Sequence, residues 1–575
     1  MKKNTGYLIL ALVIFLVLAF GAFWLGYSSG KSFMSPGKVS VAKNSWLLIN
    51  PRGPIKEYNE VDMGSFWGGG QASVEDMTRR IRYAAKDKNI KGILLEPSFM
   101  AVSYSSVREL VLALQDFRSS GKPVYAFGSN WGQRDYFLSL AADSIYMDPS
   151  ASAGLMLDGV SANITFYKEL LDKIGVKMHV LQSGEFKGAG EPYSQTSLSP
   201  GTRANLERAL RGRYDMLLDA LAKSRKISPE EARLIFEERA DFFISGTQAH
   251  EMKLVDGLCS EDELLDRLNI RKANTIEIAK YSDKAPMNLG SQRIAIINLN
   301  GEISPANTGY GSEGIISATK VQRIIEDIEE DSSVKAVVLR VNSPGGSALE
   351  SELIHRKLSR LQARIPIVVS MNGVAASGGY YISCASNYII ADEMTITGSI
   401  GVIMMIPEAS GLGRKIGLRS ESFGFGKFAS SVDPLNPYDP EFIESLRRNS
   451  TGVYTEFKQR VMDARGISPE EIQAVAEGRV FSAADAKENK LIDEIGGLRE
   501  AIAKAAELAK LTDYQVQNYP GKKGFHELLM ELKDNPMFAA SLLSKQELSP
   551  EALAQRLVDT LKARQWLYYL PYNME

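Results

Sequence analysis

The chain has 575 residues, of which 44% are hydrophobic and 24% are charged, a composition typical of a globular protein with about two to four domains. Its formal net charge of −2 gives no reason to expect nucleic acid as a partner. The two cysteines, Cys259 and Cys384, form no CxxC pair and the four histidines are scattered, which argues against zinc sites and a disulfide scaffold.

The first element in chain order is an uncharged apolar stretch, residues 7–27. At about 1.5 Å per residue it is long enough to cross a bilayer core of about 30 Å. Lys2 and Lys3 precede it and predict a cytoplasmic N-terminus, with everything after the stretch outside the cytoplasm. A cleaved secretory signal is the alternative, because "AFGA" is a weak small-x-small site. We therefore predict a transmembrane anchor over residues 1–28.

An internal repeat organises the rest of the chain. Residues 90–106 align without gaps with residues 334–350, at an offset of 244. Farther along, residues 227–258 match residues 467–498 at an offset of 240. The sequence therefore predicts a tandem duplication with a small length change inside each copy.

Each copy consists of short apolar runs that alternate with amphipathic segments. In the second copy we expect strands over residues 293–303, 334–341 and 365–371, and helices over residues 321–331 and 348–363. This β-α-β-α-β order predicts an α/β fold with a largely parallel sheet between helices. The predicted domains are a first copy over residues 45–282, a second copy over residues 293–515 and a helical, amphipathic C-terminal extension over residues 516–575, with docking or assembly as its expected use.

The copies differ where chemistry would be located. "NSPGGS" ends a strand in the second copy where the first has "SFMAVS", and residues 377–379 read SGG where the first copy has QRD. Residues kept for packing alone would be needed in both copies. The N–H groups of Gly345 and of Gly378, at a helix start, could converge as an oxyanion hole beside Ser377, a candidate acyl-transfer nucleophile. A plain tight turn and a packing serine are the structural alternative.

A serine nucleophile needs a general base. His526 lies outside the repeat and His355 sits in a charged helix, where we expect it to face solvent, so a Ser-His-Asp triad is poorly supported. A lysine can serve if burial lowers its pKa. Lys187 and Lys427 occupy equivalent places in the two copies, 240 residues apart. The residues alone do not choose between them, and an ordinary solvated side chain is the alternative for both.

Four motifs in this order, "GEFKGAGEPYS", "NSPGGS", "NGVAASGGYYIS" and "TGSIGV", resemble those of the signal peptide peptidase A (protease IV) family in its long, duplicated, membrane-anchored form. The resemblance covers essentially the whole chain and implies a Ser/Lys dyad protease of the Clp/crotonase fold. It implies that Ser377 is the nucleophile, Lys187 the base and Ser399 the residue that orients the lysine. Gly345 and Gly378 would be the oxyanion donors, and Lys427 would be a relic.

The resemblance also implies the setting of the enzyme. Its substrates would be hydrophobic peptides, the remnants of cleaved signal peptides, and it would need no cofactor or metal. It would be a single-pass protein of the inner (plasma) membrane with extracytoplasmic (periplasmic) catalytic domains, assembled as a bowl-like homotetramer. In the first copy Leu155 would stand opposite Ser399, as expected if that copy had lost the nucleophile side of the site.

Two other readings stay open at this point. A crotonase-like acyl-CoA enzyme would use the same oxyanion hole, but it needs carboxylates, and Glu350 and Glu352 lie on a helix that we expect to face solvent. A non-catalytic membrane scaffold would use the duplication only for assembly. Cys384 follows Ser377 by seven residues and is expected to be a buried core residue rather than a redox group.

Overall fold

The structure, a computed structural model, describes residues 41–60, 70–239, 241–281, 291–305 and 314–522, together with the backbone of residues 567–568. Within these ranges no helix combines the length and the apolar character needed to cross a bilayer. The predicted anchor, residues 1–28, and most of the predicted C-terminal extension lie outside the described residues.

The first copy is built on a six-stranded parallel sheet. The strand order is β11 (Gly257–Leu258), β7 (Ser144–Met147), β5 (Val124–Gly128), β3 (Ile90–Leu95), β1 (Ser45–Ile49) and β12 (Thr275–Glu277). Helices α3 (Val74–Lys86) and α4 (Tyr104–Arg118) pack on one face, and each begins at a serine whose hydroxyl accepts a backbone N–H, Ser73 and Ser103. Helix α11 (Glu261–Leu268) packs on the other face.

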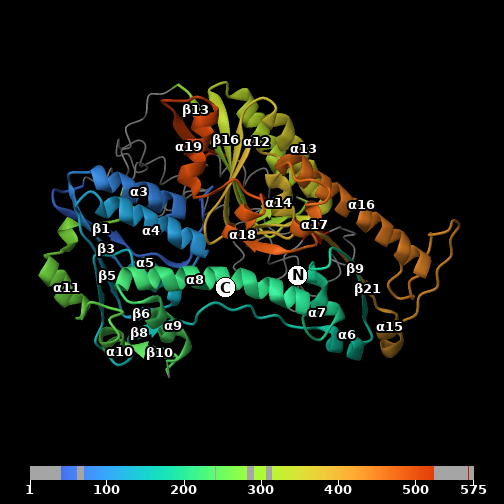
Figure 1. Cartoon of the computed structure of the whole chain (residues 1–575), viewed down its shortest axis with the longest axis horizontal. Coiled ribbons are helices and arrows are strands. Elements are labelled where there is room, and N and C mark those ends of the chain that lie inside the picture. Colours follow the sequence, from blue (N-terminus) through green and yellow to red (C-terminus); the bar gives the residue numbers. More distant parts are fainter. Residues whose placement is uncertain are drawn as a thin grey trace, which may run out of the picture.

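The second copy contains the strands and helices expected from its sequence. Its main path runs β22 (Val480–Ser482), β20 (Ile396–Gly398), β18 (Ile367–Ala376), β16 (Val334–Ser343), β13 (Arg293–Asn300) and β24 (Gln515–Tyr519), with β19 (Tyr388–Ala391) and β23 (Glu494–Ile495) branching from β18. Helices α12 (Ala318–Glu330) and α13 (Ala348–Gln362) cover one face and α19 (Leu498–Leu508) the other, as Figure 1 shows. Strand β24 pairs with β13, so the second sheet extends beyond the predicted boundary at residue 515.

The two copies repeat one topology, which confirms the α/β tandem duplication. In the second copy β20 pairs with β18 in parallel and with β22 in antiparallel fashion. The first copy has the same arrangement in a separate small sheet, where β8 (Gly154–Met156) pairs with β6 (Asn130–Trp131) and with β10 (Phe243–Ser245). Gly154 in β8 pairs with Ser245 at the end of β10, just as Ile396 in β20 pairs with Ser482 at the end of β22. Gly154 therefore corresponds to Ile396, and three residues farther on Leu157, rather than Leu155, corresponds to Ser399.

Part of the first copy crosses over to the second. After β8 the chain runs through α6 (Lys168–Ile174), β9 (Lys177–Ser183) and α7 (Glu191–Ser194) into the long helix α8 (Pro200–Arg225), and Figure 1 shows this arm lying against the second copy. Strand β9 pairs antiparallel with β21 (Val402–Glu408). The counterpart of α8 is α16 (Pro440–Arg465), which has the same length and also begins with proline at an offset of 240.

Buried charges also join the copies. The guanidinium of Arg340 on β16 is 2% exposed, and its Nη2 lies 2.7 Å from Glu109 Oε1 and 3.1 Å from Glu57 Oε2, both in the first copy. Arg108 on α4 pairs in the same way with the buried Asp392, at 2.9 Å. Because a buried charge without a partner is strongly destabilising, these pairs constrain how the copies dock.

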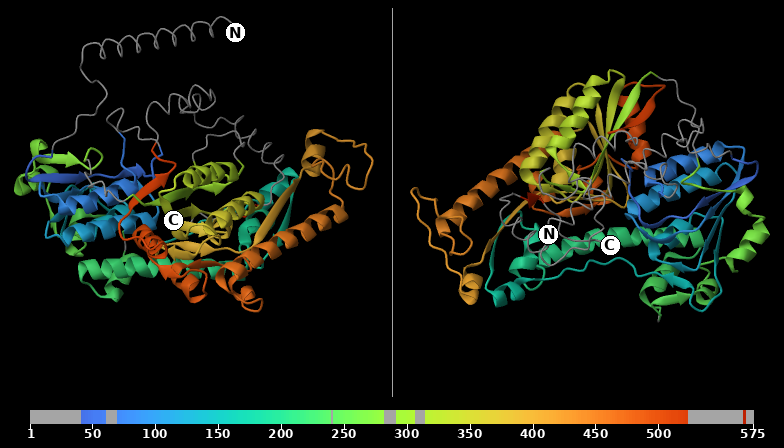
Figure 2. Two further views of the ribbon diagram at one scale, coloured as in Figure 1. Left: turned by 90° about the horizontal axis from the view of Figure 1, so that it is seen from above. Right: turned by 180° about the vertical axis from the view of Figure 1, so that it is seen from behind.

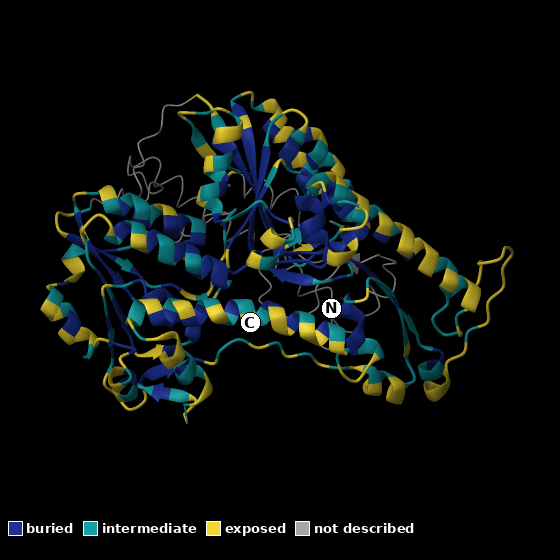
Figure 3. Cartoon of the chain, in the orientation of Figure 1, coloured by how far each residue is buried: buried dark blue, intermediate teal, exposed yellow. Residues whose placement is uncertain are grey.

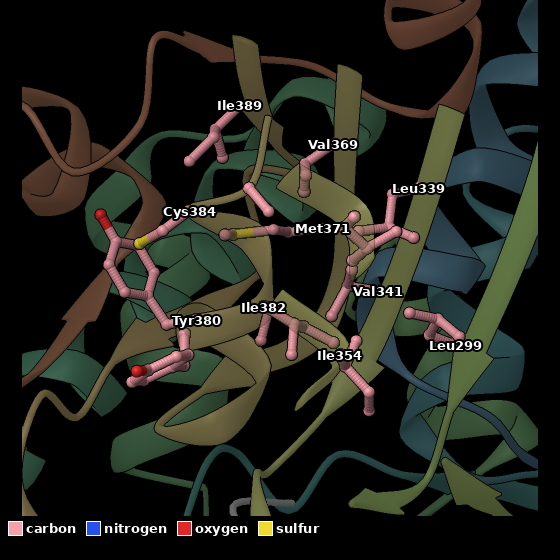
Figure 4. Packing of buried hydrophobic residues seen from close by; sticks show 14 of the residues in the cluster. Leu299, Leu339, Val341, Ile354, Val369, Met371, Tyr380, Ile382, Cys384 and Ile389 are labelled. Carbon is pink, nitrogen blue, oxygen red and sulfur yellow. The ribbon is translucent and has the colours of Figure 1, made fainter. Parts of the chain in front are cut away.

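The core behind β18 supports the turn at its carboxyl end. Figure 4 shows Cys384, Tyr380 and Met371 packed among aliphatic side chains of β16 and β18. Cys384 is buried, as predicted, and burial raises the pKa of its thiol to about 12. A thiol held protonated in this way is inert, since the thiolate is the reactive form.

Candidate active site

Ser377 lies at the sharp turn between β18 and α14 (Gly378–Ser383), where it is the N-cap of the helix. Its backbone has φ 56° and ψ −117°, a conformation that non-glycine residues rarely adopt. The N–H of Ser377 donates to the Gly398 carbonyl at 2.8 Å and fixes the turn against β20. Residues held in such rare backbone conformations cluster at functional sites, and a serine held this way is therefore a candidate functional residue.

The glycines beside Ser377 are required by close packing. A Cβ on Gly379 would lie 2.5 Å from the Ser343 carbonyl oxygen, and one on Gly346 would lie 2.1 Å from the Ile303 carbonyl oxygen. A Cβ on Gly378 would lie 3.2 Å from Gly345 Cα. The strand-end loop and the helix start therefore touch backbone to backbone, which brings their N–H groups close to one another.

The N–H of Gly378 is a candidate donor to an oxyanion, and the turn at Gly345 and Gly346 holds the other candidate donors. Gly378 is the first residue of α14, so its N–H has no partner within the helix. The N–H of Gly345 donates to Ser343 Oγ at 3.2 Å. Ile303 on β14 (Glu302–Ile303) pairs with Gly346 and donates its N–H to the Gly345 carbonyl. The Gly346 N–H therefore points away from β14, to the side on which Gly346 pairs with the backbone of Tyr568. Gly346 is thus a candidate donor that the sequence did not single out.

Lys187 comes from the crossing arm of the first copy and enters the second copy at Ser377. Its Nζ lies 2.7 Å from Ser377 Oγ, and it also contacts both the carbonyl oxygen and Oγ of Ser399, each at 2.8 Å. All three residues are buried, with at most 1% of each exposed. The structure therefore brings together three residues that the resemblance singled out, from two copies of the repeat.

The surroundings of Lys187 favour a neutral amine. Burial lowers the pKa of Lys187 well below its usual value, and none of the three atoms that Nζ contacts carries a charge. A neutral amine has two N–H donors and one lone pair. The two donors match the two oxygen atoms of Ser399, and the lone pair is then left for the Ser377 hydroxyl hydrogen.

A loop of the second copy that the sequence analysis missed holds this lysine in place. The Phe186 N–H donates to the Glu477 carbonyl at 2.6 Å, and a Cβ on Gly478 would lie 2.4 Å from the Lys187 nitrogen. The Ser399 N–H donates to the carbonyl of Arg479 at 2.6 Å. Residues 477–479 thus contact both the base and its partner. In the sequence this loop reads only as "EGR", and no rule of residue spacing connects these three residues to Lys187.

The other candidate groups do not join this cluster. Lys427 is exposed and forms an ion pair with Glu441. His355 is buried, contrary to the prediction that it faces solvent, and burial lowers its pKa to about 4. Glu352 was also expected in solvent, but it is buried and accepts from Tyr381 and from Arg460, so it serves the core.

A short strand near the C-terminus lies next to the candidate oxyanion loop. The backbone of β25 (Leu567–Tyr568) pairs antiparallel with β17 (Gly346–Ser347) on one side and with β21 at Ile403 on the other. An extended peptide backbone therefore fits between these two edges. Adding a strand to exposed sheet edges is a general mode of peptide recognition.

Comparison with known proteins adds family information. The model of "Peptidase family S49" matches residues 116–275 and 359–512, one segment in each copy and more than half of the chain in total. "Protease 4" of Salmonella typhi is 34% identical over 508 residues, which cover 85% of this chain and 81% of that protein. "Serine protease SPPA, chloroplastic" of Arabidopsis thaliana is 30% identical over 484 residues, 82% of this chain and 70% of that protein.

Among solved structures, ClpP1 from Listeria monocytogenes matches with a TM-score of 0.22 and 16% identity, over 36% of this chain and 92% of that chain. A TM-score at this level carries no argument about a shared fold. The assignment to the Clp/crotonase fold therefore stays a prediction, while the duplicated α/β architecture stands on the strand pairing described above.

Proposed function

The chain belongs to peptidase family S49, and from this premise we propose that it is a serine endopeptidase in which Ser377 and Lys187 form the catalytic dyad and remnant signal peptides are the substrates. The observation that carries the proposal is the 2.7 Å contact between Lys187 Nζ and Ser377 Oγ in a buried, uncharged setting. Family membership disfavours both the acyl-CoA enzyme and the non-catalytic scaffold.

In the first half of the proposed reaction, neutral Lys187 accepts the hydroxyl proton of Ser377. The serine oxygen bonds to the scissile carbonyl carbon, and the negative charge moves to the carbonyl oxygen. Gly378 and the Gly345–Gly346 turn supply the N–H groups that stabilise this oxyanion, each contributing about 3 kcal/mol. Lys187 then gives its proton to the leaving nitrogen as the C–N bond breaks, which leaves an acyl ester on Ser377.

In the second half, Lys187 takes a proton from water as the water attacks the ester. As the C–O bond to Ser377 in the second tetrahedral intermediate breaks, Lys187 returns this proton to the serine oxygen, which releases the peptide acid and restores the Ser377 hydroxyl. Ser399 orients the amine throughout, since both of its oxygen atoms accept from Nζ. The residues supply every proton transfer that this scheme needs.

The proposed substrate enters as an extended strand. The edges of β17 and β21 pair with the backbone of β25, and a substrate strand that takes the place of β25 would pair with them without regard to its side chains. Hydrophobic remnants of signal peptides follow from the resemblance of the motifs. The same resemblance supports an inner-membrane location with the N-terminus in the cytoplasm, periplasmic catalytic domains and a homotetramer.

Covalent labelling and hydrolysis together test this proposal. We expect the full-length protein in detergent to be labelled by a fluorophosphonate at Ser377 and to cleave a synthetic signal peptide internally. Ser377→Ala should abolish both signals. Ser383→Ala is the matched control, because Ser383 lies buried on the same helix and its hydroxyl donates to the Gly379 carbonyl. Labelling that persists in Ser377→Ala, or hydrolysis of acyl-CoA in place of peptide, would overturn the proposal.

A further inference from the structure

A tyrosine and a glutamate are hydrogen-bonded at equivalent places in the two copies. In the first copy the hydroxyl of Tyr214 on α8 donates to Glu237 Oε1 at 3.2 Å. In the second copy the hydroxyl of Tyr454 on α16 donates to Glu477 Oε1 at 2.8 Å. Each member of the second pair follows its counterpart by 240 residues, the offset of the repeat in this part of the chain. The second pair lies beside the segment that carries Lys187.

The backbone around the two glutamates differs. Glu237 is the last residue of helix α9 (Pro229–Glu237). The corresponding helix of the second copy, α17 (Ile472–Val475), ends two residues before Glu477, and Glu477 has φ 60°, which is uncommon for a residue with a side chain. Residues held in such conformations cluster at functional sites. The backbone therefore leaves the helix at the glutamate that lies beside the base.

This backbone lets Glu477 hold the turn that ends at Lys187. The turn is closed by the Lys187 N–H, which donates to the Gly184 carbonyl at 3.2 Å. Its two inner N–H groups both donate to Glu477. The Phe186 N–H donates to the backbone carbonyl at 2.6 Å, and the Glu185 N–H donates to the carboxylate oxygen Oε2 at 2.9 Å. One residue of the second copy thus accepts both inner N–H groups of a turn in the first.

Tyr454 holds Glu477 from the other side. Its hydroxyl accepts the Glu477 N–H at 3.0 Å as well as donating to the carboxylate, so it fixes both the backbone and the side chain. Tyr454 is 6% exposed and lies on the buried stripe of α16, whose remaining residues are mostly half-buried or exposed, as Figure 3 shows. Helix α16 packs against β9 and β21, and it runs past these strands in both views of Figure 2. The same helix therefore supports the strand that leads to Lys187 and the tyrosine that holds Glu477.

We propose that Glu477 and Tyr454 are positioning residues, which hold the turn at residues 184–187 so that Lys187 Nζ reaches Ser377 Oγ. This inference rests on the proposed function, because it concerns the placement of the general base. The amine itself contacts two serines, so the effect of the pair on it passes through the backbone of the turn. Gln473 also donates to the Glu477 carboxylate and assists in holding it.

Substitution of the pair in each copy tests the proposal in the full-length protein. Glu477→Ala should lower kcat for peptide hydrolysis by about 10²-fold with little change in KM, because a misplacement of about 1 Å costs that much. Tyr454→Phe should lower kcat by about tenfold, since it removes one hydroxyl and keeps the acceptors of Glu477. Glu237→Ala and Tyr214→Phe are the matched controls in the first copy and should leave kcat nearly unchanged.

A conservative variant separates the hold on the turn from the charge of the carboxylate. Glu477→Gln keeps one oxygen that can accept the Glu185 N–H, so it should recover most of the kcat that Glu477→Ala loses. A loss as large as that of Glu477→Ala would show that the negative charge matters in place of the hydrogen bond to the turn. That result would overturn the proposal.

Hydrogen exchange provides a measurement that does not depend on turnover. In Glu477→Ala the N–H groups of Glu185 and Phe186 should exchange at least about tenfold faster than in the unmutated protein. The N–H groups of α13 should keep their rates, which shows that the fold is intact. Unchanged exchange in the turn would overturn the proposal even if kcat fell.

The outcomes also separate this inference from the proposed function. If Ser377→Ala abolishes turnover and Glu477→Ala retains it, the dyad stands and the positioning role is refuted. A rise in KM at constant kcat in Glu477→Ala would place the pair at the substrate and refute it too. If Ser377→Ala retains turnover, the proposed function fails and this inference fails with it.

Discussion

The two arms of this molecule have a common origin, and their lysines are in opposite environments. Lys187 lies 1% exposed between Ser377 and Ser399, whereas Lys427, its partner in the repeat, is exposed and paired with Glu441. In the first arm β9 pairs with β21 of the second copy, whereas in the second arm, which follows α15 (Ser410–Ile416), residues 421–427 are exposed within one chain. The reactivity of a lysine here depends on the surface that receives its arm, more than on the segment that carries it.

Duplication explains why the site can be divided in this way. Because the first copy reaches into the second, the base is needed only in the first copy and the nucleophile only in the second, and the unused halves are free to change. The first copy has Leu157 where the second has Ser399, and Lys427 forms an ion pair with Glu441 at the surface. The contrast between the two lysines can be tested directly.

The largest expected effect comes from removing each lysine in turn. Lys187→Ala should lower kcat for peptide hydrolysis by at least about 10³-fold, because loss of one member of a catalytic unit removes most of its effect. Lys427→Ala should retain nearly all activity, since its exposed side chain pairs with Glu441 and lies over the Phe428 ring, away from the cluster around Ser377. Turnover by both variants is measured at equal oligomeric state. Loss of activity in Lys427→Ala alone would reverse the assignment of the base.

The repeat made much of this comparison visible in the sequence. The apolar runs correctly predicted strands β16 and β18, and the amphipathic segment between them correctly predicted helix α13. These elements are predictable because each buries its apolar residues in a regular pattern. The asymmetry between "NSPGGS" and "SFMAVS" identified the second copy as the copy with the nucleophile. The resemblance then selected Lys187, which the residues alone could not distinguish from Lys427.

The remaining features depend on contacts between distant segments. His355 and Glu352 lie in a charged helix, and only the packing of α16 and Tyr381 against that helix buries them. Gly478 has no recognisable motif, because its role depends on the approach of a segment almost 300 residues earlier. The pairing of β25 with β17 and β21 likewise joins segments that no local pattern connects.

A smaller effect should follow from displacing Lys187 without changing it. Gly478 has φ 81°, and a Cβ there would lie 2.4–2.6 Å from three atoms of Lys187. Gly478→Ala should therefore move the base and lower kcat by about 10²-fold, the cost of a misplacement of about 1 Å. Gly466→Ala is the matched control. Gly466 also has positive φ but open space around it, so activity should persist despite about 1 kcal/mol of lost stability.

The pH profile provides a measurement of the same contrast in the unmutated enzyme. Only the neutral form of Lys187 can accept the serine proton, and burial lowers the pKa of this amine well below its usual value. kcat/KM should rise about tenfold per pH unit below that lowered pKa and become constant above it. Lys427→Ala should have the same profile. A plateau reached only near the usual lysine pKa of about 10.4 would contradict a buried neutral base.

The smallest expected effect is on stability, and it has an unusual sign. Because burial lowers the pKa of Lys187 in the folded state, the unfolded chain binds one more proton than the folded chain between that lowered pKa and the usual value of about 10.4. The free energy of unfolding therefore rises with pH across this interval, and the lysine is a net cost at neutral pH. Lys187→Met keeps the apolar stem and removes the amine, so it should raise Tm at pH 7 while abolishing activity.

The pH dependence of that gain separates the protonation cost from a simple packing change. The difference in Tm between Lys187→Met and the unmutated protein should shrink as the pH approaches 10, since the unfolded lysine then loses its proton as well. Lys427→Met, at the exposed position of the repeat, should show little gain at any pH. If Lys187→Met lowers Tm equally at all pH values, the lysine stabilises the fold through its contacts with Ser399. The two arms would then differ in packing and not in the protonation of their lysines.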